Sequence, residues 1–115
     1  MLPKINRLRS GVDFNLVTKT GARFTSDNLV IYALPNNLNQ NQVGFIVNRA
    51  VGGSVSRHLV SRKLRHNFAN QLPTLNTNLK LVVRVLKAQN NYTGEVDDLI
   101  AKINNKFAKT HKADA

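Results

Sequence analysis

Residues 51–72, VGGSVSRHLVSRKLRHNFANQL, decide how the chain is organised. An α-helix turns by about 100° per residue, so side chains four positions apart share one face. From Val60 onward an apolar side chain recurs at that spacing. The apolar positions are Val60, Leu64, Phe68 and Leu72, and the positions on the opposite side are His58, Arg62, Arg65 and His66. The pattern predicts an amphipathic helix that Ser54 or Ser56 can cap and that ends at about Leu72.

The basic side of this predicted helix carries the groups that bind phosphate in proteins. Helix-start N–H groups, forked guanidinium groups and, at lower pH, imidazolium would lie together. Gly52 and Gly53 would let the helix start approach a backbone closely. Viewed down the helix axis, Arg57 falls at the angle of the apolar stripe, but it lies one turn before Val60, where the stripe begins. We therefore expect the Arg57 side chain to leave the core and face the same phosphate ligand. A solvated basic face is the alternative for such a charge run.

The remaining sequence predicts two more helices and three strands. Ser10 and Asp13 have capping-box spacing at the start of the first helix, and Gly21 is a plausible stop. Apolar alternation predicts the strands, and apolar spacings of three and four predict the last helix. The segments are a helix over 11–20, strands over 29–34, 43–49 and 79–87, and a helix over 94–108. The fold class is therefore α+β with a small mixed sheet, in the order α-β-β-α-β-α.

Positive charge is the strongest signal in the composition. Seventeen Lys and Arg against six Asp and Glu give a net charge of +11, and the pI is 10.8. Between Asp27 and Glu95 the chain has no carboxylate, so the field of its cations is not cancelled locally. Such a field attracts a polyanion, and we expect nucleic acid. A membrane surface and a merely solubilising charge are the alternatives.

The length and the apolar content fit one domain. The 115 residues are 42% hydrophobic, which is enough for one core. We expect a single RNA-binding domain over 1–115, with its core over about 5–108 and a short basic tail over 109–115. No apolar run approaches the roughly 18 residues of a membrane span, and no apolar segment follows the opening MLPKINRLR. We therefore expect a soluble cytoplasmic protein.

The sequence shows no constellation for catalysis or metal binding by side chains. It has no cysteine, no GxSxG, no P-loop, no paired carboxylates and no HExxH spacing. His58 and His66 are two helical turns apart, and no carboxylate joins them or His111. The acids that open the last helix complement its dipole and need no other role. We expect neither a catalytic residue nor a metal ligand.

Three ordered motifs resemble the bacterial ribonuclease P protein subunit. Residues 51–66, VGGSVSRHLVSRKLRH, resemble its signature helix, which is close to VGNAVxRNxxKRxxRE. The basic positions hold Arg57, Arg62 and Arg65, with Lys63 beside them. Residues 44–52, GFIVNRAVG, resemble the family strand GxSVSKKVG, and residues 6–24, NRLRSGVDFNLVTKTGARF, resemble the opening RLxxxxDFxxVxxxGxxF. The resemblance covers about residues 5–107.

Four positions depart from the family pattern and indicate a divergent member. His58 stands at an asparagine position, Ser61 at a lysine position, Gly53 at the asparagine after the first glycine, and Thr18 where many members have a second aromatic residue. The resemblance implies a three- or four-stranded sheet packed by helices, similar to the second domain of a small-subunit ribosomal protein. It also implies a left-handed β-α-β crossover through the basic helix, against the usual right-handed rule.

The resemblance further implies an activity that the chain assists. Ribonuclease P hydrolyses one phosphodiester to remove the 5′ leader of precursor tRNA, and its catalytic groups and Mg²⁺ belong mainly to the RNA subunit. The protein binds that RNA through its basic helix and holds the single-stranded leader in a cleft on the sheet. The implied partners are the catalytic RNA and precursor tRNA, not DNA or a membrane. The protein is expected as a monomer in the holoenzyme, with no Mg²⁺ site of its own.

The resemblance assigns roles to particular residues. Contacts with the catalytic RNA are expected at Arg57, His58, Arg62, Lys63 and Arg65. Contacts with the leader are expected at Phe14 and Tyr32, although either ring can instead belong to the core. Second-rank phosphate contacts are expected at Arg9, Arg23 and Arg49. Periodicity explains Phe45 and Phe68 as core residues.

Two other classes of function stay open from the sequence. A structural RNA-binding protein without a processing role, similar to a ribosomal protein, would share the charge and the fold. Such a protein would not require both the N-terminal DF…G pattern, at Asp13, Phe14 and Gly21, and the RxxxxRKxR pattern of the basic helix, at 57–65. A sequence-specific DNA-binding protein would need a helix-turn-helix pair, and the sequence shows no convincing one.

Overall fold

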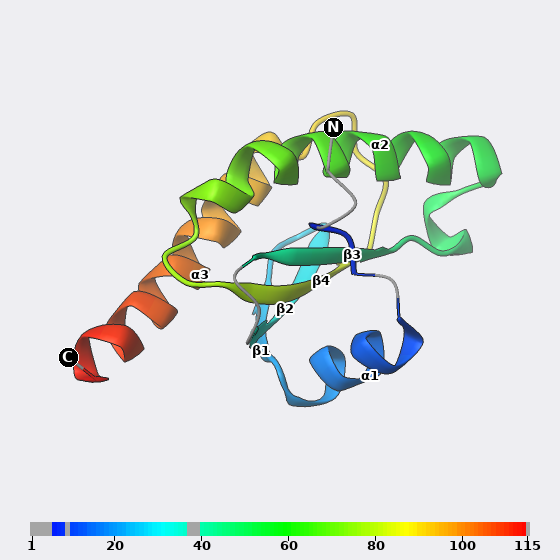
Figure 1. The fold of residues 1–115 in the computed structure, drawn as a ribbon. Helices are drawn as coiled ribbons and strands as arrows, with labels where there is room; N and C mark the ends of the chain where they lie inside the picture. The colour runs from blue at the N-terminus through cyan, green and yellow to red at the C-terminus, as the bar shows by residue number, and fades with distance from the viewer. Residues whose placement is uncertain (1–5, 9, 37–39, 115) are drawn as a thin grey trace.

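The computed structural model describes residues 6–8, 10–36 and 40–114. In chain order its elements are α1 (Gly11–Thr20), β1 (Ala22–Thr25), β2 (Leu29–Pro35), β3 (Gln42–Ile46), α2 (Ser54–Gln71), β4 (Leu79–Val85) and α3 (Thr93–Asp114) (Figure 1). The predicted order is confirmed, with β1 as an addition. Its four residues, ARFT, are too few to show a periodic pattern.

The strands form one mixed sheet in the order β1-β2-β4-β3. β2 pairs antiparallel with both β1 and β4, whereas β3 pairs in parallel with β4. A parallel pair needs a crossover between its strands, and α2 provides it. The left-handed sense of this crossover stays a prediction from the resemblance.

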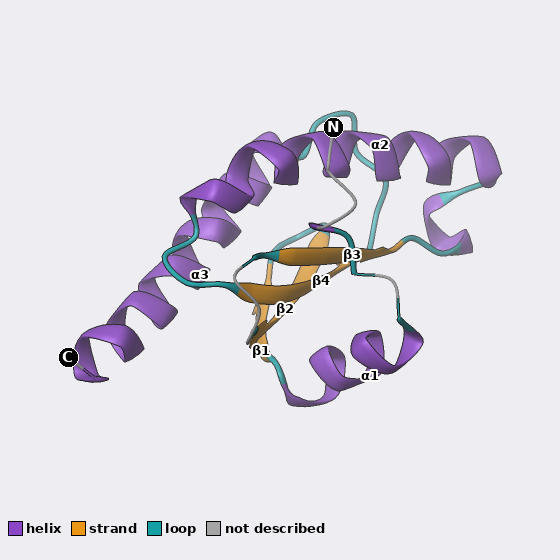
Figure 2. Cartoon of the chain, in the orientation of Figure 1, coloured by secondary structure: helices purple, strands orange, loops and turns teal. Residues whose placement is uncertain are grey.

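The two faces of the sheet are covered differently. α2 and α1 lie on opposite sides of it (Figure 2). Alternate side chains of β4 pack in the main core with α2 and α3, and we call this side the closed face. The buried residues of this core from β4 are Leu79, Leu81, Val83 and Val85, and those from α2 and the position just after it are Val60, Leu64, Phe68 and Leu72. The other side, against which α1 lies, is the open face, where Val82 packs with Leu8 and Val17 in a smaller cluster.

The stripe predicted on α2 is confirmed by its burial. Val60, Leu64, Phe68 and Leu72 are all buried. The Phe68 ring packs edge-on against the Phe45 ring at a centroid distance of 5.7 Å. Phe45 is itself half-buried and packs against the main core, as its alternation in β3 predicted.

The start of α3 is fastened to the β1–β2 turn. Glu95 accepts hydrogen bonds from Ser26 Oγ and from the side chain and backbone N–H of Asn28. Partial burial by itself would raise the pKa of Glu95, but these hydrogen bonds outweigh it and hold that pKa below its ordinary value. Just before α3, the buried Tyr92 hydroxyl donates to Lys87 O at 2.8 Å. Residues far apart in sequence therefore fix α3 to the sheet.

The predicted helix caps are wrong in detail. Ser10 occupies the N-cap of α1, but its side chain makes no capping hydrogen bond. The N-cap of α2 is Gly53, because the helix already begins at Ser54, so neither Ser54 nor Ser56 caps it. Gly52 just before it has φ +138°, a conformation that favours glycine, and an added Cβ would lie 3.0 Å from Ser56 Cβ.

Three predicted boundaries also shift. The strand predicted over 79–87 ends at Val85. The strand predicted over 43–49 ends at Ile46, because the chain then turns into a 3-10 helix over Arg49–Val51. The last helix begins at Thr93 and continues past 108 to Asp114.

Candidate nucleic-acid interface

The outward side of α2 is exposed and carries part of the predicted basic set. His58, Arg62 and His66 are exposed. Arg62, Lys63 and His66 line one hollow together with Leu59. Lys63 is half-buried, and its Nζ donates to the backbone oxygen of Asn90 at 2.9 Å. The outward side therefore presents cations to solvent, while Lys63 also holds the loop that leads into α3.

Arg57 and Arg65 lie on the row of α2 that adjoins this outward side. With Ser61 they occupy positions four apart, so the three residues form one row along the helix. All three are half-buried. The Nε of Arg57 is shielded from solvent and has no acceptor among the described residues, so Arg57 has only partly left the core. Of the five predicted contacts with catalytic RNA, His58 and Arg62 are thus exposed, whereas Arg57, Lys63 and Arg65 are half-buried.

Among the described residues, the cations of α2 have no carboxylate partner. In the described ranges, Arg57, Arg62 and Arg65 form no ion pair, whereas Lys80 of β4 pairs with Asp13 of α1 at 3.4 Å. The sequence has no acidic residue in 28–94. The positive charge of these three arginines is therefore not neutralised by neighbours in sequence, nor by an ion pair within the described part of the fold. Such a surface favours a polyanionic partner.

The strand register places one row of side chains across the open face. Directly paired residues share a face, and the pairs Arg23–Tyr32, Tyr32–Val82 and Val82–Gly44 connect all four strands. The neighbouring row includes Arg84, paired with Val30 and Ile46. Arg23 and Arg84 are exposed, and Tyr32 is half-buried. An aromatic ring therefore lies between two exposed arginines.

Phe14 of α1 completes this row on the β3 side. An added Cβ on Gly44 would lie 2.2 Å from Phe14 Cζ, so the ring occupies the space that a side chain would fill. Phe14 and Tyr32 are both half-buried and pack against the same small cluster. The structure therefore brings the two predicted aromatic residues to one face, where each contributes to packing and keeps part of its surface exposed.

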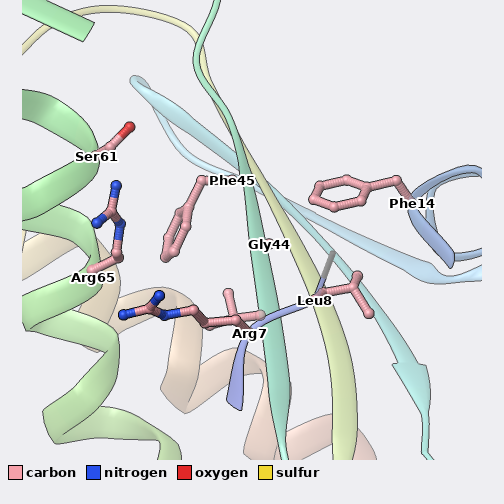
Figure 3. A pocket seen from close by; sticks show the side chains of 8 residues that line it. Arg7, Leu8, Phe14, Gly44, Phe45, Ser61 and Arg65 are labelled. Atoms are coloured by element: carbon pink, nitrogen blue, oxygen red, sulfur yellow. The ribbon is translucent and has the colours of Figure 1, made fainter. Parts of the chain in front are cut away.

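A pocket of about 310 Å³ lies at the β3 edge of the sheet (Figure 3). Phe14 and Leu8 lie on the α1 side of β3, and Phe45, Ser61 and Arg65 lie on the α2 side. Arg7 belongs to a short segment that pairs in parallel with Val43. The lining of the pocket therefore comes from both sides of β3, and the Phe14 ring fills the space beside Gly44 that a side chain would occupy.

The remaining predicted residues are not gathered at these sites. Arg49 is exposed in the connection between β3 and α2. Arg9 lies outside the described residues. Sequence reasoning did not select Arg7, Gly44 or Arg84 as site residues. Alternation in β4 already put Arg84 opposite the core, but only the strand order shows that Tyr32 is its neighbour on that face.

No group of three or more His, Cys, Asp or Glu that could hold a metal ion occurs among the described residues. No helix within 6–8, 10–36 and 40–114 is long and apolar enough to cross a membrane.

Comparisons with known proteins agree with this geometry. The family model for ribonuclease P matches residues 2–110. The ribonuclease P protein component of Arthrobacter sp. (strain FB24) is 35% identical over 113 residues, which cover 97% of this chain and 82% of that protein. The component of Acidothermus cellulolyticus is 38% identical over 90 residues, 76% of this chain and 75% of that protein.

Two solved structures have the same fold. The RNase P protein of Staphylococcus aureus, as a mutant with defective mRNA degradation activity, has a TM-score of 0.67 at 21% identity, over 96% of this chain and 88% of that one. The RNase P protein of Thermotoga maritima has a TM-score of 0.64 at 21% identity, over 90% of this chain and 93% of that one. At these identities the likeness shows the fold.

Proposed function

The chain belongs to the ribonuclease P protein family, and we propose that it acts as the protein subunit of the enzyme that removes the 5′ leader from precursor tRNA. The observation that carries this proposal is the uncompensated cationic helix α2 together with an open sheet face that carries Tyr32 and Phe14. Cations bring the protein to folded RNA, and rings in a groove stack on unpaired bases.

The two surfaces fit two RNA partners. The outward side of α2, with His58, Arg62 and Lys63, meets the catalytic RNA subunit, where guanidinium groups bind phosphates in a fork. The open face, with Tyr32 and Phe14, meets the single-stranded leader. Arg23 and Arg84 flank Tyr32 and neutralise leader phosphates. The uncompensated charge of the helix and the register of the open face support this division.

The hydrolytic step belongs to the RNA subunit in this proposal. The Mg²⁺ ions that such a reaction uses are held mainly by RNA phosphates, and no described cluster of protein side chains fits a metal ion. The chain's own residues bind and orient the leader and reduce the repulsion between two polyanions. We further propose that the protein is a monomer in the holoenzyme, works in the cytoplasm and binds neither DNA nor membranes.

A structural RNA-binding role without processing is the second candidate. It would account for the charge and for the fold. The match of the family model over residues 2–110 favours the processing role.

Reconstitution of cleavage tests the proposal. The protein is added to a bacterial ribonuclease P RNA at a Mg²⁺ concentration too low for the RNA alone, and cleavage of a precursor tRNA is followed on a gel. We expect cleavage at the mature 5′ end only when both subunits are present. Specific 5′ cleavage by a protein preparation free of RNA and of contaminating nuclease would contradict the assignment of hydrolysis to the RNA subunit. If the protein gave no more cleavage than the RNA alone, the processing role would be contradicted.

A further inference from the structure

Three hollows lie along the outward side of α2, where the helix faces the loop over 86–92 that joins β4 to α3. The widest, of about 520 Å³, has Arg62 and His66 in its lining. A second hollow of about 280 Å³ and a third of about 140 Å³ both include Asn90 of the loop. Lys63 lines all three hollows. They therefore adjoin one another along α2, and we call them together the loop groove.

The loop groove contains an apolar side chain that the fold does not bury. Leu59 lines two of the hollows and is 49% exposed, and Ala88 of the loop lies beside it in the lining. No acidic residue lines any of the three hollows, and Arg62 forms no ion pair among the described residues. Cations attract phosphates, but a bare phosphate gains nothing from a leucine. The lining therefore fits a ligand that combines an anionic part with a flat apolar part, as a nucleotide does.

The loop is held in place by contacts within the protein. The Tyr92 hydroxyl donates to Lys87 O at 2.8 Å and accepts from the Gln89 N–H at 3.0 Å. From the helix, Lys63 Nζ donates to Asn90 O at 2.9 Å. The Asn90 side chain is exposed and makes no hydrogen bond with the described residues, so its amide can donate and accept. A ligand therefore meets a preorganised loop, which reduces the ordering cost of binding.

An unpaired base within folded RNA matches these groups better than a duplex does. In an RNA duplex the bases are stacked inside, so a protein surface meets mainly phosphates and riboses. A base that is splayed out of a folded RNA exposes both its face and its hydrogen-bonding edge. In the loop groove, Leu59 can cover the face, the Asn90 amide can pair with the edge, and Arg62 can bind a neighbouring phosphate.

We propose that the loop groove binds one unpaired base of a folded RNA, with Leu59 against the base, the Asn90 amide on its edge and Arg62 beside the adjacent phosphate. The inference rests on the proposed function in one respect, since it takes this RNA to be the catalytic RNA subunit. The loop over 86–92 is then an RNA contact in its own right. It adds a contact with a base to the phosphate contacts of the basic helix.

Neutral substitutions test the contact with the base, because they leave the charge of the protein unchanged. Leu59→Ala removes the apolar contact, and Asn90→Ala removes the amide but keeps the backbone oxygen that Lys63 binds. The controls are Val55→Ala and Asn70→Ala, at exposed positions of α2 outside the three hollows. The probes are the folded catalytic RNA and a fully paired RNA duplex, each titrated with the full chain. Thermal unfolding by circular dichroism verifies that each variant is folded.

Each of the two groove variants should weaken binding of the folded RNA by about fivefold. For Leu59→Ala this is the worth of roughly 40 Å² of apolar surface, and for Asn90→Ala that of one neutral hydrogen bond. Neither variant should change the affinity for the duplex or the log–log salt slope, whereas Arg62→Gln should lower that slope by about 0.7 to 0.9. The two control variants should bind both RNAs as the wild type does.

Two results would overturn the proposal. Equal losses on the folded RNA and on the duplex would show that the groove makes no contact with an unpaired base. Wild-type affinity in both Leu59→Ala and Asn90→Ala would remove RNA from the groove and leave it to a partner of another class, such as a protein.

Chemical probing of the catalytic RNA locates the base. Dimethyl sulfate modifies the edges of unpaired adenine and cytosine, and a water-soluble carbodiimide modifies those of uracil and guanine. With saturating wild-type protein, one unpaired base should lose its reactivity. With saturating Asn90→Ala, that base should react again, while its backbone stays protected from hydroxyl radicals. Protection of the backbone without protection of any unpaired base by the wild type would contradict the base contact.

The two proposals fail separately. If reconstituted cleavage is absent but Leu59→Ala and Asn90→Ala selectively weaken binding of the folded RNA, the loop groove stands and the processing role fails. If cleavage is restored but both variants bind that RNA as the wild type does, the processing role stands and the loop groove fails.

Discussion

The closed face and the open face of this sheet share the same strands but use their side chains differently. On the closed face, the alternate residues of β4 meet two helices and are wholly buried. On the open face, α1 covers Val82 but leaves Arg84 exposed and Tyr32 half-buried. Strand alternation thus separates residues that hold the fold from residues that can meet a ligand.

Some side chains on the open face are only partly buried because α1 is too short to cover all of it. α1 is only ten residues long, and its Asp13 pairs with Lys80 at one end of β4. Arg84 lies towards the other end of β4, so the short helix leaves that part of the face uncovered. Mutations on the two faces should therefore affect different quantities.

The largest effect is expected on the closed face. Phe68→Ala removes a fully buried ring that packs against Phe45 and leaves a cavity between α2 and the sheet. It should lower the free energy of unfolding by about 3–5 kcal/mol, measured by urea denaturation. A loss below about 1 kcal/mol, the range of many surface changes, would mean that the closed face does not dominate stability.

A glycine on the open face offers a sharper test of the packing of Phe14. Gly44→Ala places a Cβ where the Phe14 ring lies, so the ring or β3 must shift, at a cost of about 1–3 kcal/mol in unfolding free energy. Gly94→Ala, where a Cβ meets nothing within 4 Å, is the matched control. The cost of Gly44→Ala should largely vanish in a Phe14→Ala background. A cost that persists there would refute this contact as its cause.

The binding role of the open face is tested at Tyr32. Tyr32→Ala should reduce the affinity of the reconstituted enzyme for a precursor with a leader of several nucleotides by about 1–3 kcal/mol, the worth of stacking on one base. Affinity for mature tRNA should be unchanged, and unfolding should show that the fold is intact. Equal weakening of both RNAs by a folded variant would remove Tyr32 from the leader site.

The smallest expected effect concerns the contact between α3 and the β1–β2 turn. The pKa of Glu95 is lowered in the fold, so its carboxylate stabilises the protein above the unfolded pKa of about 4.3, and this contribution is lost as the pH falls through the folded pKa. Glu95→Gln should therefore lower the melting temperature at neutral pH, and the difference from wild type should shrink in acid. A difference that stays constant with pH would show that the charge of Glu95 is not involved.

Local patterns were enough to predict the elements of the closed face. The spacing of Val60, Leu64 and Phe68 depends only on the geometry of one helix, and the alternation of β4 depends only on one strand. Both were confirmed because burial on one side leaves a periodic pattern in the sequence. The caps were wrong because several residues near a helix start can cap it, and backbone geometry decides which position is used.

The candidate site was less predictable because it depends on the order of the strands. Tyr32 and Phe14 came from the family resemblance, and only the structure shows the row that joins Arg23, Tyr32 and Gly44 across the sheet. The pocket between Arg7 and Arg65 has no sequence signal, because its two sides come from segments far apart in the chain. The roles of the basic residues in RNA binding stay predictions.

The most direct test of the central claim compares the affinity of two RNAs for the catalytic RNA with and without this protein. One is a precursor tRNA with a leader, and the other is the same tRNA without one. If the open face binds the leader, the protein should raise affinity for the precursor and leave affinity for mature tRNA as it is with the catalytic RNA alone. An equal gain for both tRNAs would contradict the account.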